Sequence, residues 1–240
     1  MEINRAIFFD LDRTLWDFEA NSEEALREIF FEIEFQRPTP VFEDFLALYR
    51  KINQHYWGRY KHNLVTKEEL RVGRFLEVLN RFGYSNKEAA HYMADEYVKR
   101  SPKKTKLFPG SIEVLSELKK EFNLYVITNG FEEVQHRKIK NCGLETYFQS
   151  VITSEVAGAK KPHEQIFRFA EKQAGVSANQ CSIIGDAHDA DIIGGKQAGW
   201  NTIFFDPYLE YHTTPYADYK IYELRQVLPI FGIQKSPNQD

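Results

Sequence analysis

The sequence predicts an α/β protein with a doubly wound parallel sheet, interrupted near its start by an all-helical insertion. Two observations support this fold class. From Leu107 onward, short apolar runs alternate with helical patterns, and their short connections imply parallel strands joined by right-handed crossovers. Residues 18–100 instead contain helical patterns and no convincing strand. We therefore expect a core built from residues 1–17 and 101–240 and a helical domain over residues 18–100.

Five short apolar runs are the expected strands of the sheet. The first is apolar at every position, which is typical of a parallel strand that is buried on both faces. Helical patterns follow the second, third and fourth runs and stop at Gly143, Gly175 and Gly199, because glycine favours the left-handed cap of a helix. The middle helix is expected to begin at Pro162. The five runs are residues 6–9, 124–128, 150–153, 181–185 and 201–205.

The insertion shows helical periodicity and two expected helix caps. In residues 41–60, apolar side chains recur every three or four positions and form one apolar face. Thr66 with Glu69 predicts a capping box, and Ser85 with Glu88 repeats the pattern before the next helix. A helical block placed directly after a polar strand end would overhang that end. We therefore interpret the insertion as a cap domain, with helices that simply pad the sheet as the alternative.

The composition predicts a folded chain and excludes several classes of partner. With 240 residues, 42% of them hydrophobic, the chain can bury a large core, and a net charge of -4 gives no electrostatic footprint for nucleic acid. Cys142 and Cys181 form no CxxC pattern, so we expect buried free thiols instead of a redox or zinc site. The sequence shows no signal peptide and no long apolar run, so we expect a cytoplasmic protein without a membrane segment. Residues 234–240 have the composition of a frayed tail.

Polar side chains follow the early strands at the points where those strands end. Asp10 and Asp12 come directly after the first strand, and on their own they could equally belong to a turn. Because the carboxyl ends of parallel strands meet at one edge, we expect the polar groups of several strands to gather there. Asp10, Asp12 and Asp186 form an oxygen-rich set that suits Mg²⁺, and a nearby lysine can balance the charge of a phosphoryl group. The groups after the later strands are Thr128, Asn129 and Gly130, then Lys160 and Lys161, then Asp186, Asp189 and Asp191.

Four short motifs occur in order along the chain. They read IFFDLDRTL, VITNG, KKP and IGDAHDAD. In these motifs, which together span essentially the whole chain, the sequence resembles the haloacid dehalogenase-like superfamily. The resemblance implies a Rossmann-like core with a helical class-I cap. The segments WDFEANSEEAL, INQHYW and ITNGFEEVQHRKI further resemble its noncanonical pyrimidine 5'-nucleotidase branch.

The resemblance implies catalytic roles for two aspartates and a lysine. Asp10 would be the nucleophile that forms an aspartyl-phosphate. Asp12 would be the general acid that protonates the leaving oxygen and then the base that activates water. Lys161 would neutralise charge on the nucleophile and on the transferring group. Lys160 competes for this role, but the family places the lysine directly before proline, which favours Lys161.

The resemblance also implies how a phosphate and a metal ion would be held. The hydroxyl of Thr128 and the main-chain amides of Asn129 and Gly130 would bind the phosphate. The implied cofactor is Mg²⁺, and Asp191 would orient the lysine or a metal-bound water from behind the metal ligands. The implied metal ligands are Asp10, the main-chain carbonyl of Asp12, and Asp186.

These observations predict a Mg²⁺-dependent phosphomonoester hydrolase for a small-molecule substrate, expected to be a pyrimidine nucleoside 5'-monophosphate such as UMP, dUMP or dTMP. A sugar-phosphate or phosphoglycolate-type phosphatase shares every motif and is the first alternative. The alternative from another class is a phospho-accepting signalling domain without turnover, although such domains are shorter and have no cap. Asp12 and Asp186 argue against cleavage of a carbon–halogen bond. The oligomeric state and the roles of His188 and of Arg13, where the family usually has Asp or Gly, are not fixed by the sequence.

Overall fold

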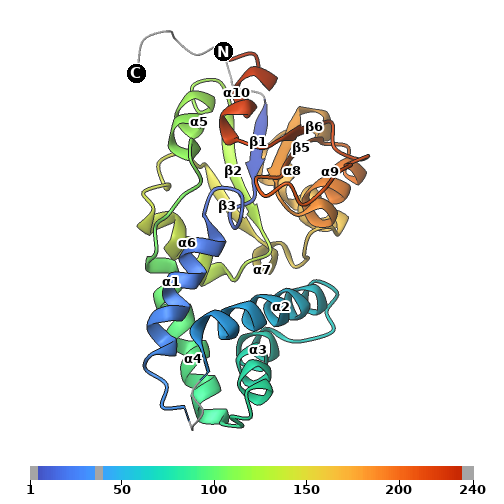
Figure 1. The fold of residues 1–240 in the computed structure, drawn as a ribbon. Helices are drawn as coiled ribbons and strands as arrows, with labels where there is room; N and C mark the ends of the chain where they lie inside the picture. Colours follow the sequence, from blue (N-terminus) through green and yellow to red (C-terminus); the bar gives the residue numbers. More distant parts are fainter. Residues whose placement is uncertain (1–4, 36–39, 234–240) are drawn as a thin grey trace. The chain divides into compact units, whose positions relative to one another are not determined.

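The structure is a computed structural model that describes residues 5–35 and 40–233. The chain divides into two compact units (Figure 1). The first, called here the sheet unit, comprises residues 1–18 and 105–240, so both ends of the chain contribute to it. The second, called the helical unit, comprises residues 19–104.

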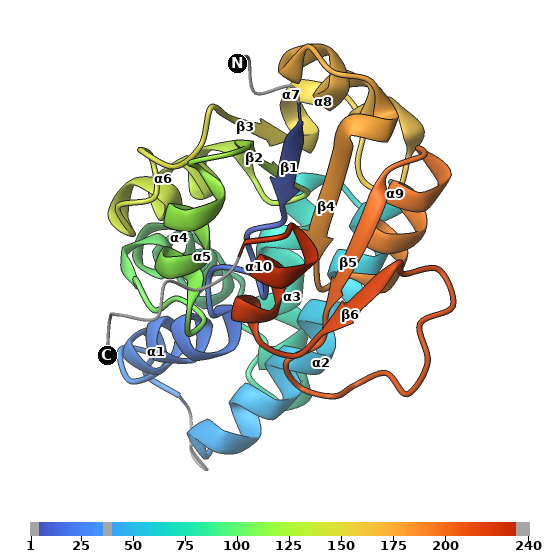
Figure 2. The same cartoon turned by 90° about the horizontal axis from the view of Figure 1, so that it is seen from above.

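The sheet unit is built around a six-stranded parallel sheet, which confirms the predicted fold class. The strand order is β3-β2-β1-β4-β5-β6, so β1 lies between β2 and β4 (Figure 2). Five strands lie at the predicted apolar runs, whereas β6 was not predicted because only Ile221 of its three residues is buried. The strands are β1 (Ala6–Phe9), β2 (Asn123–Thr128), β3 (Ser150–Thr153), β4 (Cys181–Gly185), β5 (Asn201–Phe205) and β6 (Tyr219–Ile221).

Helices connect these strands, and the three predicted glycine caps are confirmed. Gly143, Gly175 and Gly199 have φ values of 67°, 67° and 82°. Residues with a Cβ are strained in this left-handed conformation, whereas glycine adopts it readily. The helices are α5 (Ser111–Leu118), α6 (Glu132–Asn141), α7 (Ser154–Ala157), α8 (Glu164–Ala174), α9 (Gly194–Gln197) and α10 (Val227–Ile230), with the 3₁₀ turns η2 (Ala178–Gln180) and η4 (Leu224–Gln226) and the π-helical turn η3 (His188–Ile193).

The start of one helix differs from the prediction. Helix α8 begins after His163, whose ring nitrogen accepts a hydrogen bond from the main-chain N–H of Gln165, and not at Pro162. The helix that ends near Gly199 also begins unexpectedly, because the π-helical turn η3 precedes α9. The local sequence at each of these two sites has the same pattern as an ordinary helix start.

Alternate side chains of β1 face two separate hydrophobic layers. Ile7 and Phe9 pack in the layer that contains residues of α5, α6 and α10. Ala6 and Phe8 pack in the opposite layer with residues of α7 and α8, where the ring centroids of Phe8 and Trp200 lie 4.4 Å apart. All four β1 side chains are buried, as its continuous apolar sequence predicted.

The helical unit consists of four helices and a short 3₁₀ turn in the described residues. The capping box of Thr66 and Glu69 is confirmed. The second predicted cap is wrong by one residue, because Asn86, and not Ser85, accepts the hydrogen bond from the main-chain N–H of Ala89. The elements are α1 (Phe18–Phe30), α2 (Phe42–Lys61), α3 (Lys67–Arg81), α4 (Lys87–Arg100) and the turn η1 (Ser101–Lys103).

A buried arginine lies in the core of the helical unit. Arg74 is 3% exposed, and its Nη1 donates a hydrogen bond to Oδ1 of Asn53 at 2.7 Å. Its guanidinium carbon lies 5.0 Å from the ring centroid of Tyr97 and 5.2 Å from that of Phe75. No acidic side chain pairs with Arg74 in the part of the chain that the structure describes. Its charge is therefore balanced only by ring faces and one amide oxygen.

Three further expectations concern the chain as a whole. Cys181 is buried and Cys142 is half-buried, and both are free thiols. Within residues 5–35 and 40–233, no helix combines the length and apolar character needed to cross a bilayer. The tail at residues 234–240, predicted to be frayed, lies outside the described residues.

Candidate active site

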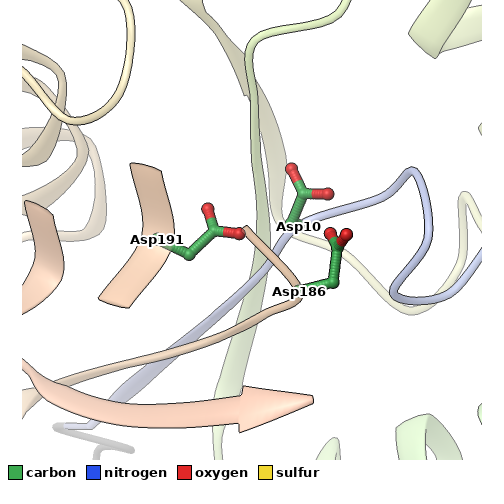
Figure 3. Close-up of side chains that lie close together, drawn as sticks. All are labelled: Asp10, Asp186 and Asp191. Atoms are coloured by element: carbon green, nitrogen blue, oxygen red, sulfur yellow. The ribbon is translucent and has the colours of Figure 1, made fainter. Parts of the chain in front are cut away.

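Three aspartates from distant parts of the sequence converge at the carboxyl end of the sheet. Asp10 follows β1, and its main-chain N–H donates to the carbonyl of Ile184 on the neighbouring strand β4. Asp186 follows β4, and Asp191 lies in the π-helical turn η3 (Figure 3). One carboxylate oxygen from each aspartate lies within 4.8 Å of the others. The central position of β1 therefore creates this cluster, as the parallel topology predicts.

Lys161 connects two of these carboxylates. Its Nζ donates hydrogen bonds to Oδ1 of Asp10 at 2.7 Å, to Oδ1 of Asp191 at 2.6 Å and to the carbonyl of Ile127 at 2.7 Å. The side chain is 2% exposed, so all three partners lie in a site with little water. Lys161 is thus the lysine of the KKP motif that reaches the aspartates.

Asp191 is held in place at both of its oxygens. Besides Lys161, it accepts a hydrogen bond from the main-chain N–H of Ala187 at 3.0 Å. It fits beneath the strand end because position 185 is glycine: a Cβ there would lie 2.2 Å from Oδ2 of Asp191. This arrangement suits a residue that orients Lys161.

The three carboxylates of Asp10, Asp186 and Asp191 carry more negative charge than the two cations that pair with them, Lys161 and Arg13, can balance. Burial raises the pKa of Asp10 to about 7, with Lys161 opposing the shift and Asp191 adding to it. Burial, followed by the charges of Asp10 and Asp191, raises the pKa of Asp186 well above its usual range. Oδ2 of Asp10 accepts no hydrogen bond from the described residues. The side chain of Asp186 is 17% exposed, and its oxygens have long contacts of 3.5 Å with Oγ1 of Thr14 and with Nε of Arg13. The unpaired oxygen of Asp10 and the weakly held oxygens of Asp186 are a donor set that fits Mg²⁺.

The side chain of Asp12 is engaged by helix α6. It forms an ion pair with Lys138, and its Oδ2 accepts a hydrogen bond from Nε2 of Gln135 at 2.7 Å. Neither partner was predicted from the sequence. The sequence pattern that could have identified Gln135 and Lys138 is their three-residue spacing. It places both polar side chains on the helix face that also carries the buried Phe131 and Ile139.

The TNG segment after β2 forms hydrogen bonds within the site. Oγ1 of Thr128 accepts from the main-chain N–H of Gly130 at 3.1 Å and from Gln135 at 2.9 Å. The side chain of Asn129 pairs with the main chain of Lys161, accepting from its N–H at 2.8 Å and donating to its carbonyl at 2.9 Å. Asn129 therefore fixes the loop that carries Lys161 relative to the end of β2.

Arg13 and His188 lie beside the carboxylate cluster. Arg13 adopts a left-handed conformation with φ of 63°. Its Nε lies 3.5 Å from Oδ2 of Asp186, and its Nη2 donates to Oε1 of Glu210 at 2.7 Å. The ring of His188 stacks on that of Tyr211, with centroids 5.5 Å apart. Both residues thus connect the cluster to the loop after β5.

Comparisons of the sequence and of the structure with known proteins point to the same family. The chain matches the haloacid dehalogenase-like hydrolase family over residues 4–199. It is 30% identical to the HAD-hydrolase YfnB of Bacillus subtilis, over 98% of this chain and 99% of that protein. A crystal structure of YfnB bound to magnesium is similar with a TM-score of 0.86 at 29% identity, covering 96% of this chain and 99% of the YfnB chain.

Two other relatives carry names that state an activity. The pyrimidine 5'-nucleotidase PynA of Streptococcus pneumoniae is 30% identical, over 92% of this chain and 92% of that protein. The glyceraldehyde 3-phosphate phosphatase of Pyrococcus furiosus is 31% identical, over 98% of this chain and 96% of that protein. Because the family match covers most of the sequence and these relatives align along nearly all of it, the chain belongs to the haloacid dehalogenase-like hydrolase family.

Proposed function

We propose that this hydrolase is a Mg²⁺-dependent phosphomonoesterase that acts through an aspartyl-phosphate on Asp10. The observation that carries the proposal is Lys161, whose buried Nζ contacts both Asp10 and Asp191. A fixed ammonium beside the nucleophile neutralises charge where a phosphoryl group would be transferred. The second oxygen of Asp10 accepts no hydrogen bond from the described residues, which leaves it available for attack.

The proposed reaction has two steps with opposite proton movements. In the first, an oxygen of Asp10 forms a bond to phosphorus, the bond to the leaving oxygen breaks, and Asp12 gives that oxygen a proton. In the second, a water oxygen attacks the same phosphorus and Asp12 takes a proton from the water. The bond between phosphorus and Asp10 then breaks, releasing phosphate and returning both aspartates to their starting state.

Asp10 and Asp186 are the side chains that would hold Mg²⁺, with the main-chain carbonyl of Asp12 implied by the family resemblance. When bound, the metal supplies positive charge to the phosphoryl oxygens. Thr128 and the amides of Asn129 and Gly130 are proposed to hold the phosphate, and the hydroxyl of Thr128 is already positioned by Gln135. The Gly130 amide donates to Oγ1 of Thr128 at 3.1 Å, so it would have to exchange this acceptor for a phosphate oxygen. Asp191 is proposed to keep Lys161 directed at Asp10, because both of its own oxygens are occupied.

We propose pyrimidine nucleoside 5'-monophosphates, with UMP, dUMP and dTMP among them, as the preferred substrates. The similarity to the pneumococcal pyrimidine 5'-nucleotidase along 92% of the chain supports this choice. The helical unit, proposed to be the cap, would select the leaving group. Glyceraldehyde 3-phosphate is the second candidate, because the Pyrococcus furiosus phosphatase is similar over a comparable length.

The role of Asp10 is tested by Asp10→Asn. This substitution keeps the size of the side chain but removes the oxygen anion that bonds to phosphorus, so turnover should fall by at least about 10³-fold, near the limit of detection. Phosphate release with Mg²⁺ present is the measurement. Asp44→Asn, the same substitution at an exposed position of α2, should retain full activity. An Asp10→Asn enzyme with more than a few per cent of wild-type activity would refute the role.

Substrate preference is tested by kcat/KM for dUMP, AMP, glyceraldehyde 3-phosphate and a hexose phosphate. Selection by shape typically gives a factor of about 10 to 200, so dUMP should exceed AMP by about ten-fold or more. If glyceraldehyde 3-phosphate or the hexose phosphate is the best substrate, the nucleotidase proposal fails and the phosphomonoesterase proposal stands.

A further inference from the structure

Helix α6 and the loop after β1 form a polar network that the proposed mechanism does not assign. We call Gln135 and Lys138 the α6 clamp, because both bind the carboxylate of Asp12. Gln135 binds one oxygen of Asp12, and Lys138 binds the other. The carboxylate is thus fixed at both ends, although its side chain is 27% exposed.

Gln135 also joins Asp12 to the TNG segment. Its Nε2 lies 2.7 Å from Oδ2 of Asp12 and 2.9 Å from Oγ1 of Thr128. The side chain is fully buried, and its Oε1 accepts no hydrogen bond from the described residues. It reaches this position only because residue 130 is glycine: a Cβ there would lie 1.7 Å from Nε2 of Gln135. An unsatisfied buried amide oxygen lowers the stability of the folded protein, so we attribute the retention of Gln135 to its hydrogen bonds with Asp12 and Thr128.

Lys138 is the charged half of the clamp. Its side chain is 5% exposed, and its Nζ lies 3.8 Å from the ring centroid of Trp16 while pairing with Asp12. Taking an ammonium out of water is costly unless it is paired and placed over an aromatic face. Both compensations come from the loop that carries Asp12. Lys138 therefore packs against this loop. Lys140, a lysine of the same helix, is exposed.

We propose that Gln135 and Lys138 are positioning residues that hold the carboxylate of Asp12 in the orientation for proton transfer, an inference that rests on the proposed phosphomonoesterase function. An aspartate that must give a proton to the leaving oxygen and then take one from water has to keep one orientation through both steps. Each carboxylate oxygen has two lone pairs, so an oxygen that accepts from the clamp keeps a second site for the leaving group or water. Through Gln135, the same clamp fixes Asp12 relative to the hydroxyl proposed to bind the phosphate.

The test uses substrates that differ in how much acid help their leaving group needs. Lys138→Met keeps an unbranched side chain over Trp16 but removes the charge, and Lys138→Arg keeps the charge. Lys140→Met is the matched control on the same helix. The measurements are kcat and KM for p-nitrophenyl phosphate, whose leaving group needs little protonation, and for an alkyl phosphate, whose leaving group needs it fully.

We expect Lys138→Met to lower kcat for the alkyl phosphate by at least about ten-fold while changing that for p-nitrophenyl phosphate by less than about three-fold. KM should change little for either substrate. Lys138→Arg should recover part of the loss, and Lys140→Met should match the wild type. Equal losses on both substrates would indicate general disruption of the site and would overturn the inference.

A double-mutant cycle with Asp12→Asn gives the second readout. If Lys138 acts through Asp12, Lys138→Met should lower alkyl phosphate turnover in the wild-type background but not further in the Asp12→Asn background. Multiplicative losses would show that Lys138 acts independently of Asp12 and would overturn the inference. If the wild type is active, Asp10→Asn is inactive and Lys138→Met is unaffected, the proposed role of the α6 clamp is refuted while the proposed function stands. A wild type that releases phosphate from no substrate refutes the proposed function and the clamp with it.

Discussion

At the scale of single residues, two glycines at the end of the sheet stand where polar side chains need room. Gly130 lies against the carboxamide of Gln135, and Gly185 lies against the carboxylate of Asp191. Neither has the positive φ found at the helix-capping glycines. Close approach, and not backbone conformation, therefore explains why these two positions carry no side chain.

Gly130→Ala should displace Gln135 and reproduce the loss of the α6 clamp. The added Cβ would lie 1.7 Å from Nε2, 2.5 Å from Cδ and 2.9 Å from Cγ of Gln135, so the whole carboxamide must leave its position. Turnover of an alkyl phosphate should then fall by about ten-fold or more, with a smaller loss on p-nitrophenyl phosphate. Steady-state kinetics on both substrates is the measurement.

Gly58→Ala is the matched control for this substitution. A Cβ at residue 58 meets nothing within 4 Å, and the residue lies within helix α2. Alanine is favoured over glycine in helices by about 1 kcal/mol, so this variant should keep its activity and unfold at a slightly higher temperature. If Gly130→Ala behaves like Gly58→Ala, the tight packing of Gln135 against residue 130 is not needed for turnover.

At the scale of secondary-structure elements, α2, α3 and α4 enclose the cation of Arg74, which has no acidic partner among residues 5–35 and 40–233. Buried charges usually pair with an opposite charge, because an uncompensated charge keeps the cost of its removal from water. In the described part of the chain, the guanidinium of Arg74 contacts Asn53 and the rings of Tyr49, Phe75 and Tyr97. Under the proposal that the helical unit selects the leaving group, Arg74 is retained for substrate recognition at a cost in stability. Such a cost is common at functional positions.

Arg74→Met should therefore leave the thermal stability unchanged or raise it. Methionine has a similar length and no charge to desolvate, although Asn53 loses its partner. Under the proposal that the helical unit selects the leaving group, kcat/KM for dUMP should fall more than that for p-nitrophenyl phosphate. Differential scanning calorimetry and kinetics check the two parts. A melting temperature lower by more than about 5 °C, which corresponds to about 2 kcal/mol for a chain of this length, would show that Arg74 mainly stabilises the fold.

At the scale of the whole molecule, the buried carboxylates link stability to pH and to metal. The pKa of Asp10 is raised to about 7 in the folded protein, whereas an unfolded aspartate has a value of about 3.9. Between these values the folded state binds more protons than the unfolded state, so stability falls as pH rises. Under the proposed function, the ionised carboxylates are the form that would bind Mg²⁺, and a bound ion would stabilise the folded state by mass action.

The metal-free protein should accordingly be less stable at pH 8 than at pH 5, by on the order of 2 kcal/mol from Asp10 alone. Mg²⁺ should restore stability more at pH 8 than at pH 5. Urea unfolding at both pH values, in EDTA and in Mg²⁺, measures this. Asp10→Asn should reduce the dependence on pH in EDTA, with the part contributed by Asp186, whose pKa is also raised, remaining. The same slope in the wild type and in Asp10→Asn would assign the effect to other groups.

The features that were predicted correctly depend on residues close together in the sequence. A continuous apolar run such as residues 6–9 can only be a buried strand or helix segment, and its length favours a strand. The parallel topology then predicted that Asp10, Asp186 and Asp191 would gather. Lys138 could not be recognised, because a buried lysine is stabilised by partners from another segment, here Asp12 and Trp16. A short edge strand such as β6 fails for a related reason, since only its pairing with β5 identifies it.

The conformation of Arg13 has a consequence for how the loop after β5 and the carboxylate cluster influence each other. Its guanidinium lies between Asp186 and Glu210 and 5.3 Å from the ring centroid of Tyr208. If Asp186 binds Mg²⁺ as proposed, the metal ion and Arg13 would compete for this carboxylate. Loop contacts that hold Arg13 at Asp186 would then weaken metal binding, and a bound metal ion would in turn release Arg13 toward Glu210 and the loop.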